Sequence, residues 1–264
     1  MAEFEELASV DGTIAPTASA TVPLKDDGLY RGDGAFEVIR LYGGRPFALA
    51  EHLDRLGRSA AAIALELDRR SLEAEIEGLL AAAGPVDGQL RLIVTRGGRR
   101  IAATEPVPPH AESVAVATVP YSTTLILNRV KSLSYAANMH ATRLAREAGA
   151  DEAVLVTAGG TVLEPPTSTI FWAGHDGVLR TPSLELPILD SITRERLLGE
   201  LEVEQGEFPL EDLRGAAEAF LASTTREVQA VSAVDSSPLA AVPGPRTLEA
   251  QRAFAAVLER ELGT

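Results

Sequence analysis

Glycine and proline residues divide this chain into short segments, and the positions of these breaks constrain the fold more than any other feature of the sequence. Gly43-Gly44 and Gly97-Gly98 stand between runs typical of strands, and Gly84-Pro85 ends a helical pattern. Pro108-Pro109 and Pro165-Pro166 interrupt the chain again. Helical and strand periodicities occur among these breaks, which predicts an α+β protein of mixed α/β type.

The expected elements suggest two domains. We expect a smaller N-terminal α/β domain over residues 1–119 and a larger C-terminal domain over residues 120–264. Residues 1–25 carry little signal. The expected helices span 50–65, 71–84, 134–150 and 246–262; the segment 174–201 is expected to form a hairpin strand, a loop and a helix capped by Asp190 or Ser191. The other expected strands lie in 28–49, 89–100, 113–121, 160–164 and 218–235.

Composition excludes several classes of function. The formal charge of −14 argues against nucleic acid or an anionic membrane as a partner. The absence of cysteine excludes disulfides and thiolate catalysis, and we expect no metal site. No apolar run approaches the roughly 20 residues of a membrane span. The acidic start lacks a signal pattern, so the cytoplasm is the expected location.

The use of lysine points to a chemical role. Lys131 is one of only two lysines in a chain that otherwise takes its positive charge from arginine, and the other is Lys25. A guanidinium stays protonated and cannot form an imine, whereas a lysine amine can. Lys131 lies between an apolar segment and an apolar helical pattern, where a solvated lysine at a helix start is the alternative. Glu164 follows in GTVLEPP, where a carboxylate alone would be an ordinary loop charge. Together they are the Schiff-base amine and the carboxylate for a pyridinium nitrogen that an enzyme using pyridoxal 5'-phosphate (PLP) needs.

These segments resemble a known family. Lys131 with ADEAVLV, GTVLE and STIFW after it is similar to the class IV, or fold type IV, PLP-dependent aminotransferases. That family includes branched-chain and D-amino acid aminotransferases, (R)-amine transaminases and aminodeoxychorismate lyases. The resemblance covers about residues 26–235. It implies a two-domain fold like that of D-amino acid aminotransferase, and a homodimer.

The resemblance also implies cofactor-binding residues. The pattern H-x-x-R-L-x-x-S begins at His52, and its Arg55 would contact the cofactor phosphate, although alone it would be read as a surface arginine. The segment DSITR places a helix N-terminus at the phosphate, with Ser191 where glycine is usual. Lys131 would be the catalytic residue and would also bind the cofactor. The other expected cofactor-binding residues are Arg55, Tyr135, Glu164, Ser191, Ile192, Thr193 and Thr224.

Substrate residues are expected on three segments. RGDGAFEV resembles a family segment that forms one wall of the active site, which implies that Arg31, Phe36 and Arg40 lie near the substrate. Arg99, or Arg100 beside it, is a candidate for the substrate carboxylate, and Thr225 would lie beside that carboxylate. The R-x-H pair of typical D-amino acid aminotransferases has no match, because Ile101-Ala102 occupy its place.

The implied activity is transamination. The enzyme would transfer an amino group to an α-keto acid such as α-ketoglutarate or pyruvate. The amino donor would be an amino acid, of either the D or the L configuration, or an amine. One alternative is aminodeoxychorismate lyase, which forms 4-aminobenzoate and pyruvate; another is a non-catalytic small-molecule-binding domain. Leu133-Ser134-Tyr135 after the lysine, and the short chain, favour the lyase and D-aminotransferase branch over branched-chain enzymes.

Overall fold

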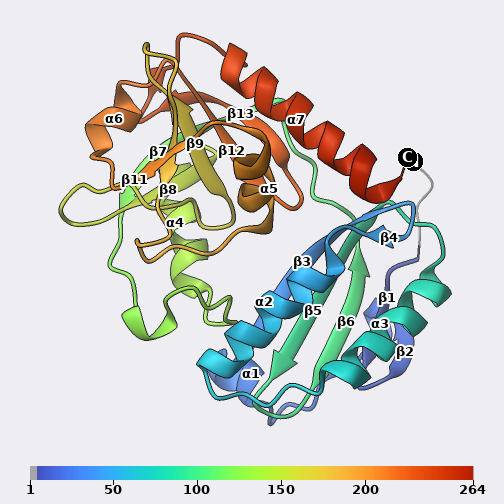
Figure 1. The fold of residues 1–264 in the computed structure, drawn as a ribbon. Helices are drawn as coiled ribbons and strands as arrows, with labels where there is room; N and C mark the ends of the chain where they lie inside the picture. The colour runs from blue at the N-terminus through green and yellow to red at the C-terminus, as the bar shows by residue number, and fades with distance from the viewer. Residues whose placement is uncertain (1–4, 264) are drawn as a thin grey trace. The chain divides into compact units, whose positions relative to one another are not determined.

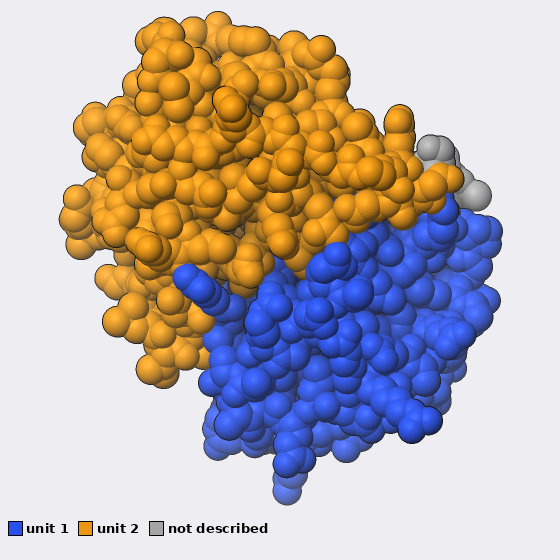
Figure 2. All heavy atoms as spheres, in the orientation of Figure 1, with its two compact units in different colours: residues 1–108, 129–135 blue, residues 109–128, 136–264 orange. Residues whose placement is uncertain are grey.

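The computed structural model describes residues 5–263 and divides into two compact units. Unit 1 contains residues 1–108 and 129–135, and unit 2 contains residues 109–128 and 136–264 (Figure 2). The sequence places the domain boundary at residues 119–120, whereas the units divide at Pro108 and the segment that carries Lys131 returns to unit 1. The first four residues, part of the acidic start, lie outside the described residues.

Unit 1 is built on an antiparallel sheet with the strand order β2-β1-β6-β5-β3-β4. The long pairing of β3 with β5 runs from Gly34 opposite Thr95 to Leu41 opposite Gly88. The strands are β1 (Leu7–Val10), β2 (Thr13–Pro16), β3 (Gly34–Tyr42), β4 (Arg45–Pro46), β5 (Gly88–Thr95) and β6 (Arg100–Glu105).

Two amphipathic helices, α2 (Leu49–Ala62) and α3 (Arg69–Ala83), cover one face of this sheet (Figure 1). Leu53 and Leu56 of α2 and Ile76 of α3 are buried in one core with the sheet side chains Ile39 and Leu92. Burial of such side chains is worth about 1.5–3 kcal/mol each. The alternation along β3 therefore decides which side chains face α2 and which face away from it. The remaining helices of unit 1 are α1 (Asp27–Arg31) and the 3-10 turn η1 (Thr17–Ser19).

Unit 2 is built on a mixed sheet with the order β11-β10-β9-β12-β13-β7-β8, and β14 pairs with β13. β7 pairs in parallel with β13 and with β8, and β10 pairs in parallel with β11. The strands are β7 (Ser113–Pro120), β8 (Glu152–Val156), β9 (Thr169–Ala173), β10 (Leu179–Pro182), β11 (Glu204–Gly206), β12 (Glu218–Ser223), β13 (Glu227–Val234) and β14 (Ser237–Pro238).

The central strands of unit 2 are buried, as their near-continuous apolar sequences require. One core cluster includes Val154, Trp172 and Leu221, and another packs Ala141 and Ala145 of α4 (Ala136–Glu147) against Leu155. The helices of unit 2 are the 3-10 turn η2 (Leu125–Leu127), α4 (Ala136–Glu147), α5 (Ile192–Glu200), α6 (Leu210–Arg214) and α7 (Pro245–Leu262).

Three details differ from the sequence-based expectations. Residues expected to carry little signal contain β1 and β2, because β1 gains its partner from β6 far along the chain. The turn expected around Arg31 is preceded by helix α1, which ends at Gly32 with a left-handed φ of 66°. Glu164 follows two isolated bridges rather than a regular strand. Among residues 5–263, no helix is both long and apolar enough to cross a membrane.

Candidate active site

Lys131 is held through its backbone on both sides within unit 1. Its N–H donates to the hydroxyl of Ser59 on α2 at 3.1 Å. Its carbonyl accepts from the N–H of Phe36 on β3 at 3.0 Å, and the next residue, Ser132, forms a bridge with Ala35. The lysine segment therefore continues the sheet edge beside β3, with α2 fixing its other side. This arrangement favours a positioned lysine over the alternative of a solvated one.

Aromatic rings surround the amine of Lys131. Its Nζ lies 4.2 Å from the centroid of the Phe36 ring and 5.5 Å from that of Tyr135. The two rings meet edge to face with their centroids 5.2 Å apart. Phe36 faces away from the helix-covered core because β3 alternates. Lys131 and Tyr135, predicted from one segment, and Phe36, predicted from RGDGAFEV, are therefore brought together.

Arg55 is buried, not a surface side chain, and pairs with a carboxylate that the sequence reasoning did not assign. Its Nε and Nη2 donate to the two oxygens of Glu37 at 2.7 and 2.6 Å. His52, one turn earlier on α2, places Nδ1 2.8 Å from Glu37 Oε2. All three side chains are nearly inaccessible to solvent. A carboxylate at a core-facing position of β3 was the available signal, since a buried charge requires a partner.

The charges of this cluster support one another. Burial alone would raise the pKa of Glu37, but the charge and hydrogen bonds of Arg55, together with His52, lower it to about 2. Burial lowers the pKa of His52, and the charges of Arg55 and Lys131 act in the same direction against the opposing effect of Glu37. At neutral pH the cluster is an ionised Glu37–Arg55 pair with a neutral histidine.

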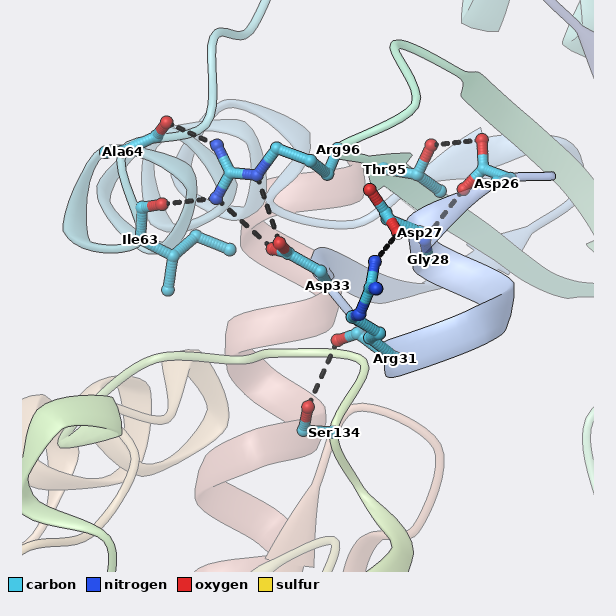
Figure 3. Close-up of polar contacts among 11 residues, drawn as sticks. Asp26, Asp27, Gly28, Arg31, Asp33, Ile63, Ala64, Thr95, Arg96 and Ser134 are labelled. Carbon is cyan, nitrogen blue, oxygen red and sulfur yellow. Dashed lines mark hydrogen bonds and ion pairs between the residues drawn. The ribbon is translucent and has the colours of Figure 1, made fainter.

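The arginines predicted to lie near the substrate differ in exposure and in the groups that they contact. Arg31 is exposed on α1 and pairs with Asp27 (Figure 3). Arg40 lies on the same face of β3 as Phe36, donates to the carbonyls of Leu41 and Gly88, and has its guanidinium 4.6 Å from the centroid of the Tyr42 ring.

The arginines of the loop after β5 form ion pairs with carboxylates on other segments of unit 1. Arg99 pairs with Asp11, and Arg100 pairs with Glu75 at 2.7 Å. Figure 3 shows Arg96 reaching Asp33, and its guanidinium also donates to two backbone carbonyls at the end of α2, those of Ile63 and Ala64. Asp26 joins the same region, since it accepts from Gly28 N at 2.8 Å and from the Thr95 hydroxyl at 2.9 Å. These contacts fasten α1 to the β5–β6 turn.

Glu164 lies in unit 2 beside the loop that leads into α5. Its Oε1 accepts the N–H of Leu189 at 2.9 Å, and its backbone carbonyl accepts the N–H of Leu155 on β8. Arg194 on the first turn of α5 is buried, and the charge of Glu164 is among those that act on it. The carboxylate is therefore held by structured backbone.

The N-terminus of α5 has the form predicted for an anion site. Ser191 is the N-cap, and its hydroxyl accepts the N–H of Arg194 at 3.3 Å. Its φ of −82° suits any residue, so serine in place of glycine causes no strain. Ile192 and Thr193 are the next two residues, whose N–H groups have no acceptor within the helix, and both are buried. An anion accepting from these groups would also gain from the helix dipole.

The predicted turn at Thr224 and Thr225 lies between β12 and β13 and is half-buried. The adjacent Arg226 stabilises it, because its N–H donates to the Ser223 hydroxyl at 3.3 Å and its guanidinium binds Glu152 on β8 at 2.7 Å. No site role was predicted from the sequence for Arg226 or for Ser59. Ser59 was visible only as the last residue of the helix pattern, since its contact with Lys131 spans distant parts of the chain.

Comparison with known proteins gives the family. The model of the family described as Amino-transferase class IV matches residues 34–234. D-alanine aminotransferase from Listeria monocytogenes is 31% identical over 96% of both chains, and a putative branched-chain-amino-acid aminotransferase from Methanocaldococcus jannaschii is 34% identical over 86% of this chain and 87% of that protein. A hypothetical aminotransferase from Mycobacterium tuberculosis, solved in a PLP-bound form, superposes with a TM-score of 0.86 at 25% identity over 95% of this chain and 98% of that chain. The same protein was solved with α-ketoglutarate and PMP.

The chain belongs to the Amino-transferase class IV family. The resemblance inferred from the sequence and the mixed α/β fold are confirmed, and the chain is an enzyme rather than a non-catalytic binding domain. The relatives are named as aminotransferases, which favours transamination over the lyase alternative.

The residues present fit a phosphorylated pyridine aldehyde. A positioned primary amine at Lys131 fits an aldehyde, and the buried N–H groups of Ile192 and Thr193 fit a phosphate. The amine of Lys131 belongs to unit 1, and the N–H groups of Ile192 and Thr193 belong to unit 2. Among residues 5–263, no group of three or more histidine, aspartate or glutamate side chains could hold a metal ion.

Proposed function

We propose that this chain catalyses PLP-dependent transamination of an amino acid, with Lys131 as the amine that bonds the cofactor. The observation that carries the proposal is the clamp on Lys131, whose N–H is held by Ser59 and whose carbonyl is held by Phe36. A clamped backbone limits the positions of the amine and so favours reaction at a defined place. The PLP-bound relative from M. tuberculosis supports the choice of cofactor.

PLP, when bound, supplies an aldehyde carbon that bonds amines and a ring that withdraws electrons from the substrate carbon. The amine of Lys131 removes the α-proton of the substrate as a general base and returns it as a general acid. Glu164 keeps a ring nitrogen protonated through its negative charge. Tyr135, whose ring lies near the amine of Lys131, orients that amine during the transfer.

Candidate phosphate ligands occur in each of the two units. The N–H groups of Ile192 and Thr193, after the Ser191 cap, donate to phosphate oxygens. Thr224 adds a hydroxyl and an N–H, and Arg55 adds charge-assisted hydrogen bonds. Each of these groups is fixed locally by a helix start, a tight turn or the ion pair with Glu37.

We propose a D-amino acid as the donor and an α-keto acid, α-ketoglutarate or pyruvate, as the acceptor. The similarity to D-alanine aminotransferase supports the D configuration, and the α-ketoglutarate complex of the M. tuberculosis protein supports the acceptor. Phe36 and Thr225 contact the substrate.

We propose that Arg31 and Arg40, rather than Arg99, bind the substrate carboxylate. The Arg31–Asp27 pair is exposed, and exposed pairs are worth only about 0–1 kcal/mol, so a substrate carboxylate can displace Asp27 at little cost. Arg40 lies on the Phe36 face of β3. Arg99 is less exposed than Arg31 and is engaged by Asp11.

Borohydride reduction of the PLP-loaded enzyme, followed by peptide mass mapping, tests the chemistry. We expect the reduced cofactor on the peptide that contains Lys131; a label on Lys25 or no label contradicts the proposal. A panel of D-amino acids, L-amino acids, (R)-amines and aminodeoxychorismate tests the substrate. Activity confined to L-branched-chain amino acids contradicts a D-amino acid donor, and pyruvate release from aminodeoxychorismate restores the lyase alternative.

We also propose a homodimer. Apolar side chains lie exposed on and before α1, with Leu24 at 71%, Leu29 at 62% and Tyr30 at 55% exposure. The three residues lie close together in the chain, and exposed apolar side chains that form a contiguous patch mark interaction surfaces. Light scattering after gel filtration should give twice the chain mass, and Leu29→Asp should shift the protein toward a monomer. A wild-type monomer contradicts the proposal.

A further inference from the structure

Strand β3 carries a carboxylate on the face that packs against α2. Ala35, Ile39 and Leu41 share this face and are buried in the core of unit 1, and Glu37 between them is fully buried as well. An unpaired carboxylate there would cost several kcal/mol. Glu37 must therefore be held by specific partners.

Those partners occupy one side of α2. Arg55 presents Nε and Nη2 to the two carboxylate oxygens at 2.7 and 2.6 Å, the two-bond fork that fixes a guanidinium in plane. His52, three residues earlier, binds Oε2 through Nδ1 at 2.8 Å. Since residues three apart lie on the same helix face, one carboxylate orients both side chains.

The same two elements hold the catalytic lysine. Ser59, one turn after Arg55 on α2, accepts the N–H of Lys131. Phe36, the neighbour of Glu37 on β3, donates its N–H to the carbonyl of Lys131. The Glu37–Arg55 fork therefore ties α2 to β3 at the point where both grip the lysine. All these contacts lie within unit 1.

We propose that Glu37 is a positioning residue that orients the Arg55 guanidinium for the cofactor phosphate, with His52 bracing the carboxylate. This inference rests on the proposed binding of PLP by Arg55. Glu37 binds the guanidinium of Arg55 through two hydrogen bonds, so it would affect the phosphate through the orientation of the arginine.

Charge and geometry predict opposite effects for Glu37→Gln. The carboxylate cancels the charge of Arg55, so its removal leaves a more positive site, and charge alone would tighten phosphate binding. Glutamine offers one oxygen and an NH₂ group, which cannot accept both guanidinium donors. Loss of the fork frees the guanidinium to rotate, and positioning therefore predicts weaker phosphate binding.

The test compares the dissociation constants of PLP and of pyridoxal, which lacks the phosphate, by fluorescence titration. We expect Glu37→Gln to weaken PLP binding about tenfold, within the range of coupling between contacting residues, and to leave pyridoxal binding within about twofold. In the Arg55→Ala background, Glu37→Gln should have little further effect on PLP binding. A loosened fold would weaken both ligands together.

A matched control exists in the same sheet. Glu105 on β6 also accepts three hydrogen bonds, from Arg91 Nε and Nη2 at 2.7 and 2.9 Å and from Gln89 at 2.6 Å. Glu105→Gln should leave the dissociation constants of PLP and pyridoxal unchanged. Glu37→Asp, which keeps the charge but shortens the side chain, supplies a second variant should the glutamine variant not fold, and it too should lose PLP affinity selectively.

The outcomes distinguish a failure of the positioning role of Glu37 from a failure of the proposed function. Unchanged or tighter PLP binding in Glu37→Gln, or an equal loss for PLP and pyridoxal in both Glu37 variants, overturns the positioning role while the proposed function stands. A wild-type enzyme without a borohydride-reducible adduct at Lys131 overturns the proposed function, and this inference with it.

Discussion

Lys131 shows how a single residue is specified by contacts that the chain makes far from it in sequence. Ser59 is 72 residues away, and Phe36 lies on a different element. The position of Lys131 between α2 and β3 depends on hydrogen bonds of its own backbone N–H and carbonyl. A substitution of the lysine side chain leaves these bonds intact.

Replacement of the amine should therefore remove chemistry without unfolding the chain. Lys131→Ala should lose the borohydride-reducible cofactor adduct and transaminase activity, with a melting temperature close to that of the wild type. Lys131→Arg should be equally inactive, because the guanidinium keeps the charge but cannot form an imine. Lys25→Ala is the control and should keep the adduct. An adduct that persists in Lys131→Ala would refute the assignment.

Glu164 is expected to act through its charge. Glu164→Gln keeps an acceptor for the N–H of Leu189, so the local structure should survive. The half-reaction with a good amino donor, measured in single-turnover experiments, should slow by about a hundredfold or more, which corresponds to about 3 kcal/mol. Cofactor colour should persist with a shifted spectrum. An unimpaired rate with a small loss of stability would identify Glu164 as structural.

At the scale of elements, the sequence predicted α2, α3, α4, α7 and the β12–β13 hairpin, because their periodicity and their glycine or proline ends are local signals. It missed β1 and β2, because β1 becomes a strand by pairing with the distant β6 and β2 by pairing with β1. It also left Glu37 unassigned. Periodicity indicates that a strand position is buried, but not which cation on another element will meet a carboxylate there.

The site was predictable to the extent that it consists of local motifs. The Ser191 cap and the turn at Thr224 are local and are present as predicted. The ion pair of Arg99 with Asp11 joins residues 88 positions apart, and the fork of Arg55 with Glu37 joins two elements. Such pairings depend on three-dimensional packing, so the sequence pattern alone did not reveal them.

The cap of α5 gives a prediction about an element. Ser191→Ala should lower the free energy of unfolding by about 1 kcal/mol, and Ser191→Gly by only a few tenths. PLP affinity should change little in Ser191→Gly, because the proposed donors at Ile192 and Thr193 are backbone groups. Chemical denaturation and cofactor titration measure the two effects. A large loss of PLP affinity in the glycine variant would show that the serine hydroxyl itself binds the cofactor.

Helix α7 begins against a carboxylate from another element. Glu218 on β12 accepts the N–H of Arg246 at 3.0 Å, and the N–H and hydroxyl of Thr247 at 2.8 Å each. Gly244 makes room for it, since a Cβ there would lie 2.4 Å from a Glu218 oxygen. Gly244→Ala should therefore destabilise the protein by about 1–3 kcal/mol in urea unfolding.

Gly57 offers the matched control for this substitution. A Cβ at Gly57, inside α2, meets no atom within 4 Å. Gly57→Ala should stabilise the protein by about 0.5–1 kcal/mol, because alanine is the better helix former. Equal effects at the two glycines would mean that the close approach at Gly244 carries no cost.

At the scale of the whole molecule, the buried cluster in unit 1 predicts how stability responds to acid. The pKa of His52 is lowered from 6.5 by burial, so below pH 6.5 the unfolded chain takes up a proton that the folded chain resists. Glu37 adds a second stage, because its pKa falls from 4.5 to about 2 on folding despite its burial, through Arg55 and His52. The free energy of unfolding should therefore decrease from pH 6.5 downward, and more steeply from 4.5 toward 2.

Urea unfolding across this pH range measures the effect. Glu37→Gln should be less stable than the wild type at pH 7, and the difference should shrink as the pH falls below 4.5. His52→Gln should flatten the decrease between pH 6.5 and 4.5. Curves for the variants that run parallel to the wild type throughout would show that the cluster does not titrate on unfolding.

The path of the chain through its two units limits how this enzyme can be cut or recombined. The chain leaves unit 1 after Pro108, returns for residues 129–135 and leaves again. A gene fragment that ends at Pro108 would encode the Ser59 and Phe36 that grip the lysine, but not the lysine itself. A fragment that begins at Pro109 would encode the lysine without its clamp. A single crossover at that point between two such genes would bring a lysine from one parent into a clamp from the other, so the two must remain compatible as a pair in any chimaera that keeps its activity.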